Sequence, residues 1–318
     1  MTIAITGLDT FLGVQLAERL LENPQAPRVI GLDQQRPLRL QGRVGFHRVD
    51  LSDPTADGQV AGILEKEAVD VLVHLAFKSA PSPDLDADHE LETIGSLHVM
   101  NACAAAGVRK LVMASSTMLY GARPDNPNFL DESHELRGHP DAHCVQNRVE
   151  VEALLSAWAD RHTDTEVCVL RHCWVMGPRF RDRVVRYFDR GVVPTMLGYD
   201  PLLQLIHEED LLRVFEAAVL EPHPGIFNIV GRGVLPLSSL LALAGKRALP
   251  LPPALLHRFL AVLSQTATGD PAAGFWDYLR YLWIADGERG WAEFGEPVYS
   301  TREAWSSFVS SRLMSRYR

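Results

Sequence analysis

Short apolar runs alternate with longer stretches of helical periodicity through residues 1–175. Helical spacing is clearest in Leu12, Leu16 and Leu20. Regular alternation of this kind predicts an α/β fold, a Rossmann-type doubly wound parallel sheet with helices on both faces. The strand-like runs are Ile3–Thr6, Arg28–Asp33, Phe46–Leu51, Val69–Ala76, Lys110–Ser116 and Glu166–Arg171, and the other helix-like stretches are Gly58–Glu67, Leu91–Ala106 and Cys144–Arg161.

Beyond residue 175 the pattern changes, because proline and glycine become frequent and the apolar runs shorten. Short strands are expected at Leu203–His207 and Gly225–Val230, and helical patches at Pro252–Leu263 and Phe275–Trp283. No flexible linker precedes this part. We therefore expect residues 1–175 to form the Rossmann domain, and residues 176–318 a smaller, mixed α/β substrate-binding part interleaved with it.

The first strand leads into a turn with the chemistry of a phosphate site. Gly7 is placed to turn the chain and Gly13 to let the next helix pack closely on the sheet. The N-terminus of that helix, Thr10 with Phe11 and Leu12, would present free N–H groups to a pyrophosphate. Thr10 stands where the pattern has a second glycine. Its side chain crowds the phosphate, although its hydroxyl could bond a phosphate oxygen, so a bound cofactor is a separate prediction from the fold.

An acidic residue ends the second predicted strand, at a sequence spacing from the glycine turn that is typical of dinucleotide-binding folds. Asp33 lies 33 − 13 = 20 residues beyond Gly13, the spacing expected for a carboxylate that binds ribose hydroxyls. A carboxylate there also repels a 2′-phosphate, which favours NAD over NADP. The nearby Arg36 softens this preference.

Composition excludes several classes of partner. With 31 Lys and Arg against 40 Asp and Glu, the net charge is −9 and no basic run occurs, so nucleic acid is not an expected partner. The four cysteines form no CxxC pair, which predicts no metal site and suits a reducing cytoplasm. The most apolar tract, Leu235–Leu263, is broken by charges and prolines and is not expected to span a membrane. No signal peptide is visible, so we predict a cytoplasmic protein.

Taken together, these motifs resemble those of the extended short-chain dehydrogenase/reductase family, of the NAD-dependent epimerase/dehydratase type. The resemblance implies that Asp50 and Leu51 flank the adenine, that Leu75 and Ala76 line the cofactor cleft, and that the protein is a homodimer. Its landmarks are Thr6-Gly7…Gly13, Asp33, Asp50-Leu51, His74-Leu75-Ala76, Ala114–Gly121, Leu170-Arg171…Gly177-Pro178, Ile206–Asp210 and Phe227–Gly231.

The catalytic signature of that family, Tyr-x-x-x-Lys with a glutamate four residues later, is altered here. With Glu152 as anchor, Cys144 takes the tyrosine position and Arg148 the lysine position. The family's asparagine on the preceding helix falls on Glu92, and of the usual four residues only the serine, Ser116, is retained. The candidate catalytic residues are therefore Ser116, Cys144 and Arg148.

These replacements change the chemistry that is available. Arginine cannot hand on a proton, whereas Cys144 could act as acid, base or nucleophile if Arg148 and the helix N-terminus lowered its pKa. Cysteine is also shorter than tyrosine by a whole ring, so the usual hydride-transfer route is not expected. Three structural alternatives stay open: Cys144 is a buried, inert thiol, Arg148 pairs with Glu152, and Ser116 only bonds backbone.

The expected substrate is an apolar small molecule. Trp174 stands where nucleotide-sugar epimerases carry an asparagine, and we take Trp174 and Thr117 as candidate substrate residues. Three functions are consistent with the sequence: an enzyme with altered chemistry, an inactive dinucleotide-binding sensor or scaffold, and a non-redox dehydratase, cyclase or isomerase that uses the apolar cleft with or without a cofactor.

Overall fold

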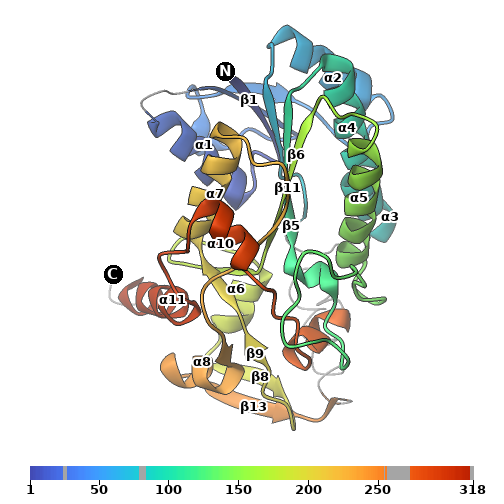
Figure 1. The fold of residues 1–318 in the computed structure, drawn as a ribbon. Coiled ribbons are helices and arrows are strands. Elements are labelled where there is room, and N and C mark those ends of the chain that lie inside the picture. The colour runs from blue at the N-terminus through green and yellow to red at the C-terminus, as the bar shows by residue number, and fades with distance from the viewer. Residues whose placement is uncertain (24–26, 79–83, 254, 256–272, 316–318) are drawn as a thin grey trace.

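A seven-stranded parallel sheet forms the centre of the computed structural model, which describes residues 1–23, 27–78, 84–253, 255 and 273–315 (Figure 1). The strand order is β11-β6-β5-β4-β1-β2-β3, so the direction of winding reverses between β1 and β4. The predicted doubly wound sheet is thereby confirmed. The strands are β1 (Thr2–Thr6), β2 (Arg28–Asp33), β3 (Gly45–Arg48), β4 (Val71–His74), β5 (Lys110–Ser116), β6 (Glu166–His172) and β11 (Gly225–Ile229).

Helices cover both faces of this sheet. Figure 1 shows α1 (Phe11–Glu22), α7 (Glu208–Leu220) and α10 (Glu288–Phe294) on one side. The other side carries α2 (Ala56–Lys66), α4 (Gly95–Ala106) and α5 (His143–Ala159). The short helix α3 (Leu85–His89) and a π-helical turn (Glu90–Ile94) precede α4, which therefore begins later than the predicted Leu91.

The apolar residues of each strand divide between two cores. Along β1, Ile3 and Ile5 belong to the core under α1 and α7, whereas Ala4 belongs to the core under α2 and α4. Successive strand residues point to opposite faces, and both faces are buried. This explains why these strands read as continuous apolar runs.

The remaining elements form a smaller layer beyond the carboxyl ends of the strands. They include β7 (Trp174–Met176), β8 (Val192–Met196), β10 (Leu205–His207), β13 (Arg247–Leu251), α6 (Arg183–Phe188), α8 (Leu237–Leu243) and α11 (Thr301–Ser315). Between β10 and α8, the chain re-enters the main sheet through α7 and β11. It therefore crosses between the two layers more than once.

Two predicted helices of this layer are not observed as continuous α-helices in the described residues. Within the Phe275–Trp283 patch the structure has a 3₁₀ helix, Ala273–Leu279, rather than an α-helix. Of the Pro252–Leu263 patch, residue 254 and residues 256–263 lie outside the described residues. In the described part of the chain, no helix is long and apolar enough to cross a membrane.

Candidate functional site

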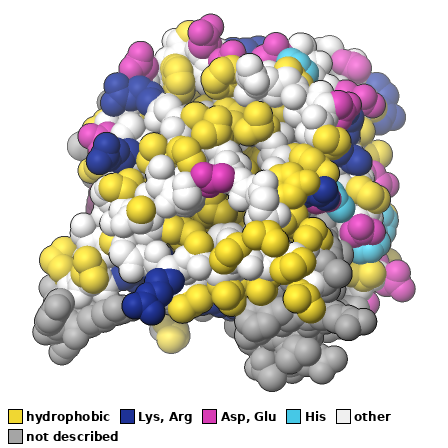
Figure 2. Space-filling view, turned by 90° about the horizontal axis from the view of Figure 1, so that it is seen from below, with side chains coloured by type: hydrophobic (Ala, Val, Ile, Leu, Met, Phe, Trp, Pro, Cys, Tyr) yellow, Lys and Arg dark blue, Asp and Glu magenta, His cyan; other side chains and the backbone are white. Residues whose placement is uncertain are grey.

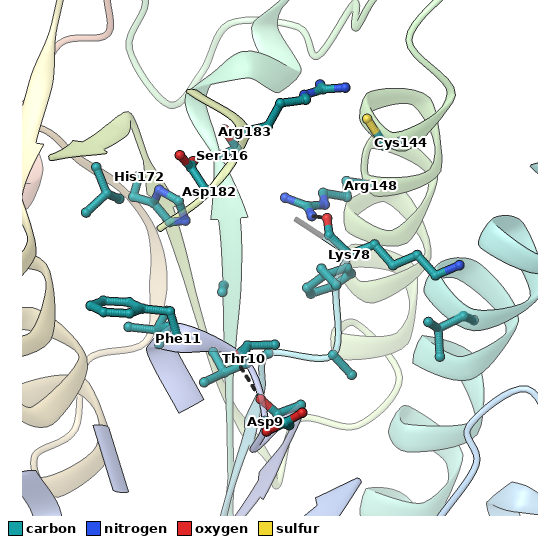
Figure 3. A pocket seen from close by; sticks show the side chains of 18 of the residues that line it. Asp9, Thr10, Phe11, Lys78, Ser116, Cys144, Arg148, His172, Asp182 and Arg183 are labelled. Carbon is teal, nitrogen blue, oxygen red and sulfur yellow. Dashed lines mark hydrogen bonds between the residues drawn. The ribbon is translucent and has the colours of Figure 1, made fainter. Parts of the chain in front are cut away.

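A cavity of about 890 Å³ lies at the carboxyl ends of β1, β2, β4, β5 and β6 (Figure 3). Open α/β sheets bind ligands at this place, where the strand order reverses. The cavity brings together most of the residues that the sequence singled out: Gly7, Thr10, Phe11, Leu12, Asp33, Leu51, Leu75, Ala76, Ser116, Cys144, Arg148 and Trp174. Gly13, Asp50 and Thr117 do not line it.

The turn between β1 and α1 requires both of its glycines. Gly7 has φ +68°, and a Cβ there would lie 2.5 Å from the carbonyl oxygen of Leu75. A Cβ on Gly13 would lie 2.9 Å from Leu8 Cα and closer still to the carbonyl oxygen of Gly7. Gly13 thus acts beneath the cavity, by letting α1 pack on the sheet as predicted.

Thr10 is the N-cap of α1 and has an ordinary φ of −70°. Its hydroxyl donates to the carbonyl oxygen of Gly7 (2.7 Å) and accepts from the Gly13 amide (3.0 Å). The hydroxyl proton is therefore used within the turn. A bond to a phosphate oxygen would require this hydroxyl to leave the Gly7 carbonyl, and it stays a prediction.

Two carboxylates meet at the end of β2. Asp33 accepts hydrogen bonds from the amides of Asp9 (2.9 Å) and Gln34 (2.7 Å), and both Asp9 and Asp33 line the cavity. Burial and the charge of Asp33 raise the pKa of Asp9.

Asp50 was expected beside the adenine, but it does not line the cavity, although its hydrogen-bond partner Ser52 does. It accepts from the amide (3.0 Å) and the hydroxyl (2.6 Å) of Ser52, which lower its pKa. These bonds form an Asx turn, which holds the Asp50 carboxylate against the backbone of Ser52.

Arg148 points from α5 toward the loop after β4. It donates to the carbonyl oxygen of Lys78 (2.8 Å), lies 3.7 Å from Glu92 Oε1 and stacks over the ring of Phe77. Glu92, fully buried in the π-helical turn, also accepts from the amides of Lys78 (3.0 Å) and the Asn147 side chain (3.3 Å). The alternative that Arg148 pairs with Glu152 is therefore wrong.

Glu152 is instead the partner of Arg171. The Glu152 carboxylate lies 2.6 Å from Nη2 and 3.0 Å from Nε of Arg171, and the Ser115 hydroxyl also donates to it. Both charged side chains are buried. This pair, with Ser115, ties α5 to β5 and β6.

Cys144 lines the cavity near the N-terminus of α5. Burial raises the pKa of its thiol, although the charges of Arg148 and Arg183 act in the opposite direction. The expectation of a lowered pKa is wrong, because desolvation outweighs the two cations.

An apolar wall closes the end of the cavity opposite Asp33. Trp174 lies flat against Phe275, with ring centroids 5.6 Å apart, and its indole N–H points to the sulfur of Met118 (3.3 Å). Thr117, the other substrate candidate, is fully buried and does not line the cavity. Of the aromatic residues in the Phe275–Trp283 patch, Phe275 lines the cavity, whereas Trp276, Tyr278 and Trp283 are buried and do not line it.

Comparison with known proteins agrees with this geometry. The model of the NAD-dependent epimerase/dehydratase family matches residues 3–230. The chain belongs to the NAD-dependent epimerase/dehydratase family. An uncharacterised protein of Mycobacterium tuberculosis is 31% identical over 98% of this chain and 84% of its own length. A UDP-glucose 4-epimerase of Mycolicibacterium smegmatis is 27% identical over 56% of this chain and 58% of its own length.

Solved structures show the same fold. The UDP-glucose 4-epimerase of Thermotoga maritima, solved with UDP-glucose, superposes with a TM-score of 0.75 at 20% identity, covering 99% of this chain and 100% of that one. The dTDP-glucose 4,6-dehydratase of Bacillus anthracis, in complex with NAD, gives a TM-score of 0.75 at 16% identity, covering 100% and 98%.

In this member of the epimerase/dehydratase family, sequence reasoning missed several residues that line the cavity. Among the lining residues that the structure describes there is no tyrosine, and the Lys78 ammonium pairs with Asp88. The only sequence signal for His172 was its place at the end of a strand. Met118 lies in the 3₁₀ helix Thr117–Tyr120, Arg183 begins α6, and the others lie in loops. The residues missed include Asp9, Phe77, Lys78, Met118, His172, Phe180, Arg181, Asp182 and Arg183.

The raised pKa of Cys144 predicts that its thiol reacts slowly with alkylating reagents. Because only the thiolate is nucleophilic, we expect iodoacetamide to alkylate Cys144 more slowly at pH 7 than a free cysteine, with a rate that rises toward alkaline pH. Mass spectrometry of the native protein measures this rate, and the fully buried Cys103 is the internal control. Alkylation faster than that of free cysteine would show an activated thiol.

Proposed function

We propose that this protein binds NAD(H) and acts on an apolar small molecule by chemistry that differs from the usual Tyr-Lys route. One observation carries the proposal: a single cavity runs from Asp33, past the turn at Gly7, to the wall of Trp174 and Phe275. Such a cavity suits a ligand whose nucleotide lies at the Asp33 end and whose reacting ring lies toward Trp174 and Phe275. Figure 2 shows hydrophobic side chains gathered over much of the face seen from below.

The residues of the turn fit a dinucleotide. The amides of Phe11 and Leu12 have no acceptor within α1, so they and the helix dipole are available to a pyrophosphate. Thr10 does not prevent this, because its hydroxyl is turned back into the cap. When bound, the nicotinamide would accept or supply a hydride, while this chain's residues orient the substrate and exclude water.

The adenosine end favours NAD over NADP. Asp9 and Asp33 place two carboxylates at the end of β2, and burial together with repulsion from Asp33 raises the pKa of Asp9. A 2′-phosphate would add further negative charge at this point.

The reacting end supports altered chemistry. Arg148 is occupied by Lys78 and Glu92, and burial keeps the Cys144 thiol protonated at neutral pH. Neither side chain reproduces a tyrosine acidified by a lysine. The apolar wall of Trp174 and Phe275 favours an apolar substrate over the nucleotide sugars that several relatives bind.

Replacing Asp33 tests the cofactor. We expect Asp33→Ala to weaken NAD⁺ binding by about tenfold or more, because ribose hydroxyls lose a charged acceptor. Isothermal titration calorimetry measures the affinity. Asp131→Ala is the matched control, because Asp131 also accepts a backbone amide in an exposed turn (Ser133, 2.8 Å) but lies outside the cavity. Equal affinities in the two variants would contradict the assignment.

An inactive NAD-binding sensor or scaffold is the second candidate. The neutral Cys144 and the occupied Arg148 favour it, since neither is poised for proton transfer. NAD binding without turnover of any alcohol, ketone or sugar nucleotide would select this function. A non-redox enzyme without a cofactor would instead turn over its substrate without binding NAD. The homodimer and the cytoplasmic location stay predictions.

A further inference from the structure

Ser116 and His172 lie side by side at the inner end of the cavity. They are register partners at the last positions of the parallel strands β5 and β6, and both line the cavity. Neighbouring strands are about 4.8 Å apart, and paired residues point to the same side of the sheet. Figure 3 shows the two side chains across the cavity from Cys144 and Arg148 on α5.

The tautomer of His172 follows from its one hydrogen bond. Nδ1 lies 2.9 Å from the carbonyl oxygen of Cys173, which can only accept, so Nδ1 carries the proton. Burial, with a smaller contribution from the charge of Arg148, lowers the pKa of His172 to about 4, so the ring is neutral at pH 7. Nε2 is then an unprotonated acceptor that no described residue engages.

Ser116 supplies the complementary group. Its oxygen accepts from the Met118 amide (3.2 Å), and its hydroxyl hydrogen has no acceptor among the residues that the structure describes. The hydroxyl can therefore donate to a ligand while its oxygen stays bound to the backbone.

We propose that Ser116 and His172 together bind a hydroxyl group of the substrate, with Ser116 donating to the hydroxyl oxygen and His172 Nε2 accepting its proton in a hydrogen bond. The inference rests on the proposed function and names its substrate class: an apolar alcohol, whose hydrocarbon part packs against Trp174 and Phe275. The weak basicity of His172 makes it a group that orients the hydroxyl rather than one that stores its proton.

The pair discriminates between an alcohol and the matching ketone. An alcohol satisfies both groups, whereas a ketone accepts from Ser116 and leaves Nε2 of His172 without a donor. An acceptor left unpaired in a buried site costs binding energy. The full-length protein should therefore bind 2-octanol more tightly than 2-octanone in the presence of NADH.

Nitrogen NMR of the ¹⁵N-histidine-labelled protein tests the tautomer without any ligand. The resonance of His172, identified by its loss in His172→Gln, should show a protonated Nδ1 and an unprotonated Nε2 at pH 7. Adding 2-octanol should shift Nε2 toward the hydrogen-bonded range, and 2-octanone should not. A protonated Nε2 would overturn the proposal.

Variants test the hydrogen bond itself. His172→Phe keeps a ring but removes the acceptor, so 2-octanol affinity should fall about tenfold, the equivalent of one hydrogen bond, while 2-octanone affinity changes less than twofold. His172→Gln, which retains an acceptor, should recover part of the loss. His162→Phe is the matched control, because His162 also bonds a backbone carbonyl oxygen (Trp158, 2.8 Å) but lies outside the cavity.

The outcomes separate the two proposals. If the protein fails to bind NADH, the proposed function is wrong. If it binds NADH but neither octyl compound, or if His172→Phe weakens both compounds equally or neither, the inference is wrong while the cofactor assignment stands.

Discussion

Replacing Gly13 with alanine is expected to abolish measurable NAD binding and to lower the free energy of unfolding by about 3 kcal/mol. The added Cβ would overlap the backbone at Gly7 and Leu8, which are rigid parts of the turn rather than movable side chains. α1 must then move away from the sheet. Its N-terminal amides would no longer face the pyrophosphate.

Gly62 supplies the matched control for this substitution. It lies in the interior of α2, with nothing within 4 Å of an added Cβ. We expect Gly62→Ala to raise the free energy of unfolding by about 0.5–1 kcal/mol, because alanine costs less backbone entropy in a helix. Urea denaturation and calorimetry with NAD⁺ measure both variants. Normal NAD affinity in Gly13→Ala would contradict the close packing at the turn.

Glu152→Ala is expected to lower the free energy of unfolding by about 3–5 kcal/mol. The variant leaves the buried guanidinium of Arg171 without its counter-charge. Tyr120 still accepts from Arg171 (2.9 Å) but brings no negative charge. Because the pair joins α5 to β6, α5, which carries Cys144, should also lose its fixed position against the sheet.

An exposed ion pair distinguishes this effect from loss of any carboxylate. Glu296 and Arg232 lie 3.4 Å apart with both side chains largely exposed, so Glu296→Ala should change stability by less than about 1 kcal/mol. Glu152→Gln, which keeps the side-chain volume and one acceptor, should fall between the two. Thermal and urea unfolding provide the values. A loss below 1 kcal/mol in Glu152→Ala would show that water reaches the Arg171 site.

The fold was accessible from the sequence because its signals are local. Apolar runs such as Val71–His74, buried on both faces, and the glycine turn at Gly7 carry their meaning within a few residues. Boundaries were less accurate where a local irregularity intervened. The π-helical turn at Glu90–Ile94 leaves no periodic signature, and it delays the start of α4.

The site was only partly accessible because partners distant in sequence decide its chemistry. The spacing of Arg148 and Glu152 suggested a helical pair. In the fold, however, Arg148 lies beside Glu92 and Glu152 pairs with Arg171. Likewise the pKa of Cys144 depends on burial by the second layer, which the helix itself does not reveal. The register of β5 with β6, which places His172 beside Ser116, is a property of the folded sheet.

The most direct test of the central claim, that this cavity holds a nicotinamide dinucleotide, is titration calorimetry of the full-length protein with NAD⁺, NADH and NADP⁺. Native mass spectrometry of the freshly purified protein complements it. We expect one site per chain, with affinity for NAD⁺ above that for NADP⁺ and a bound mass equal to that of the dinucleotide. Absence of heat at millimolar NAD⁺ and NADH, together with an adduct-free mass, would contradict the account.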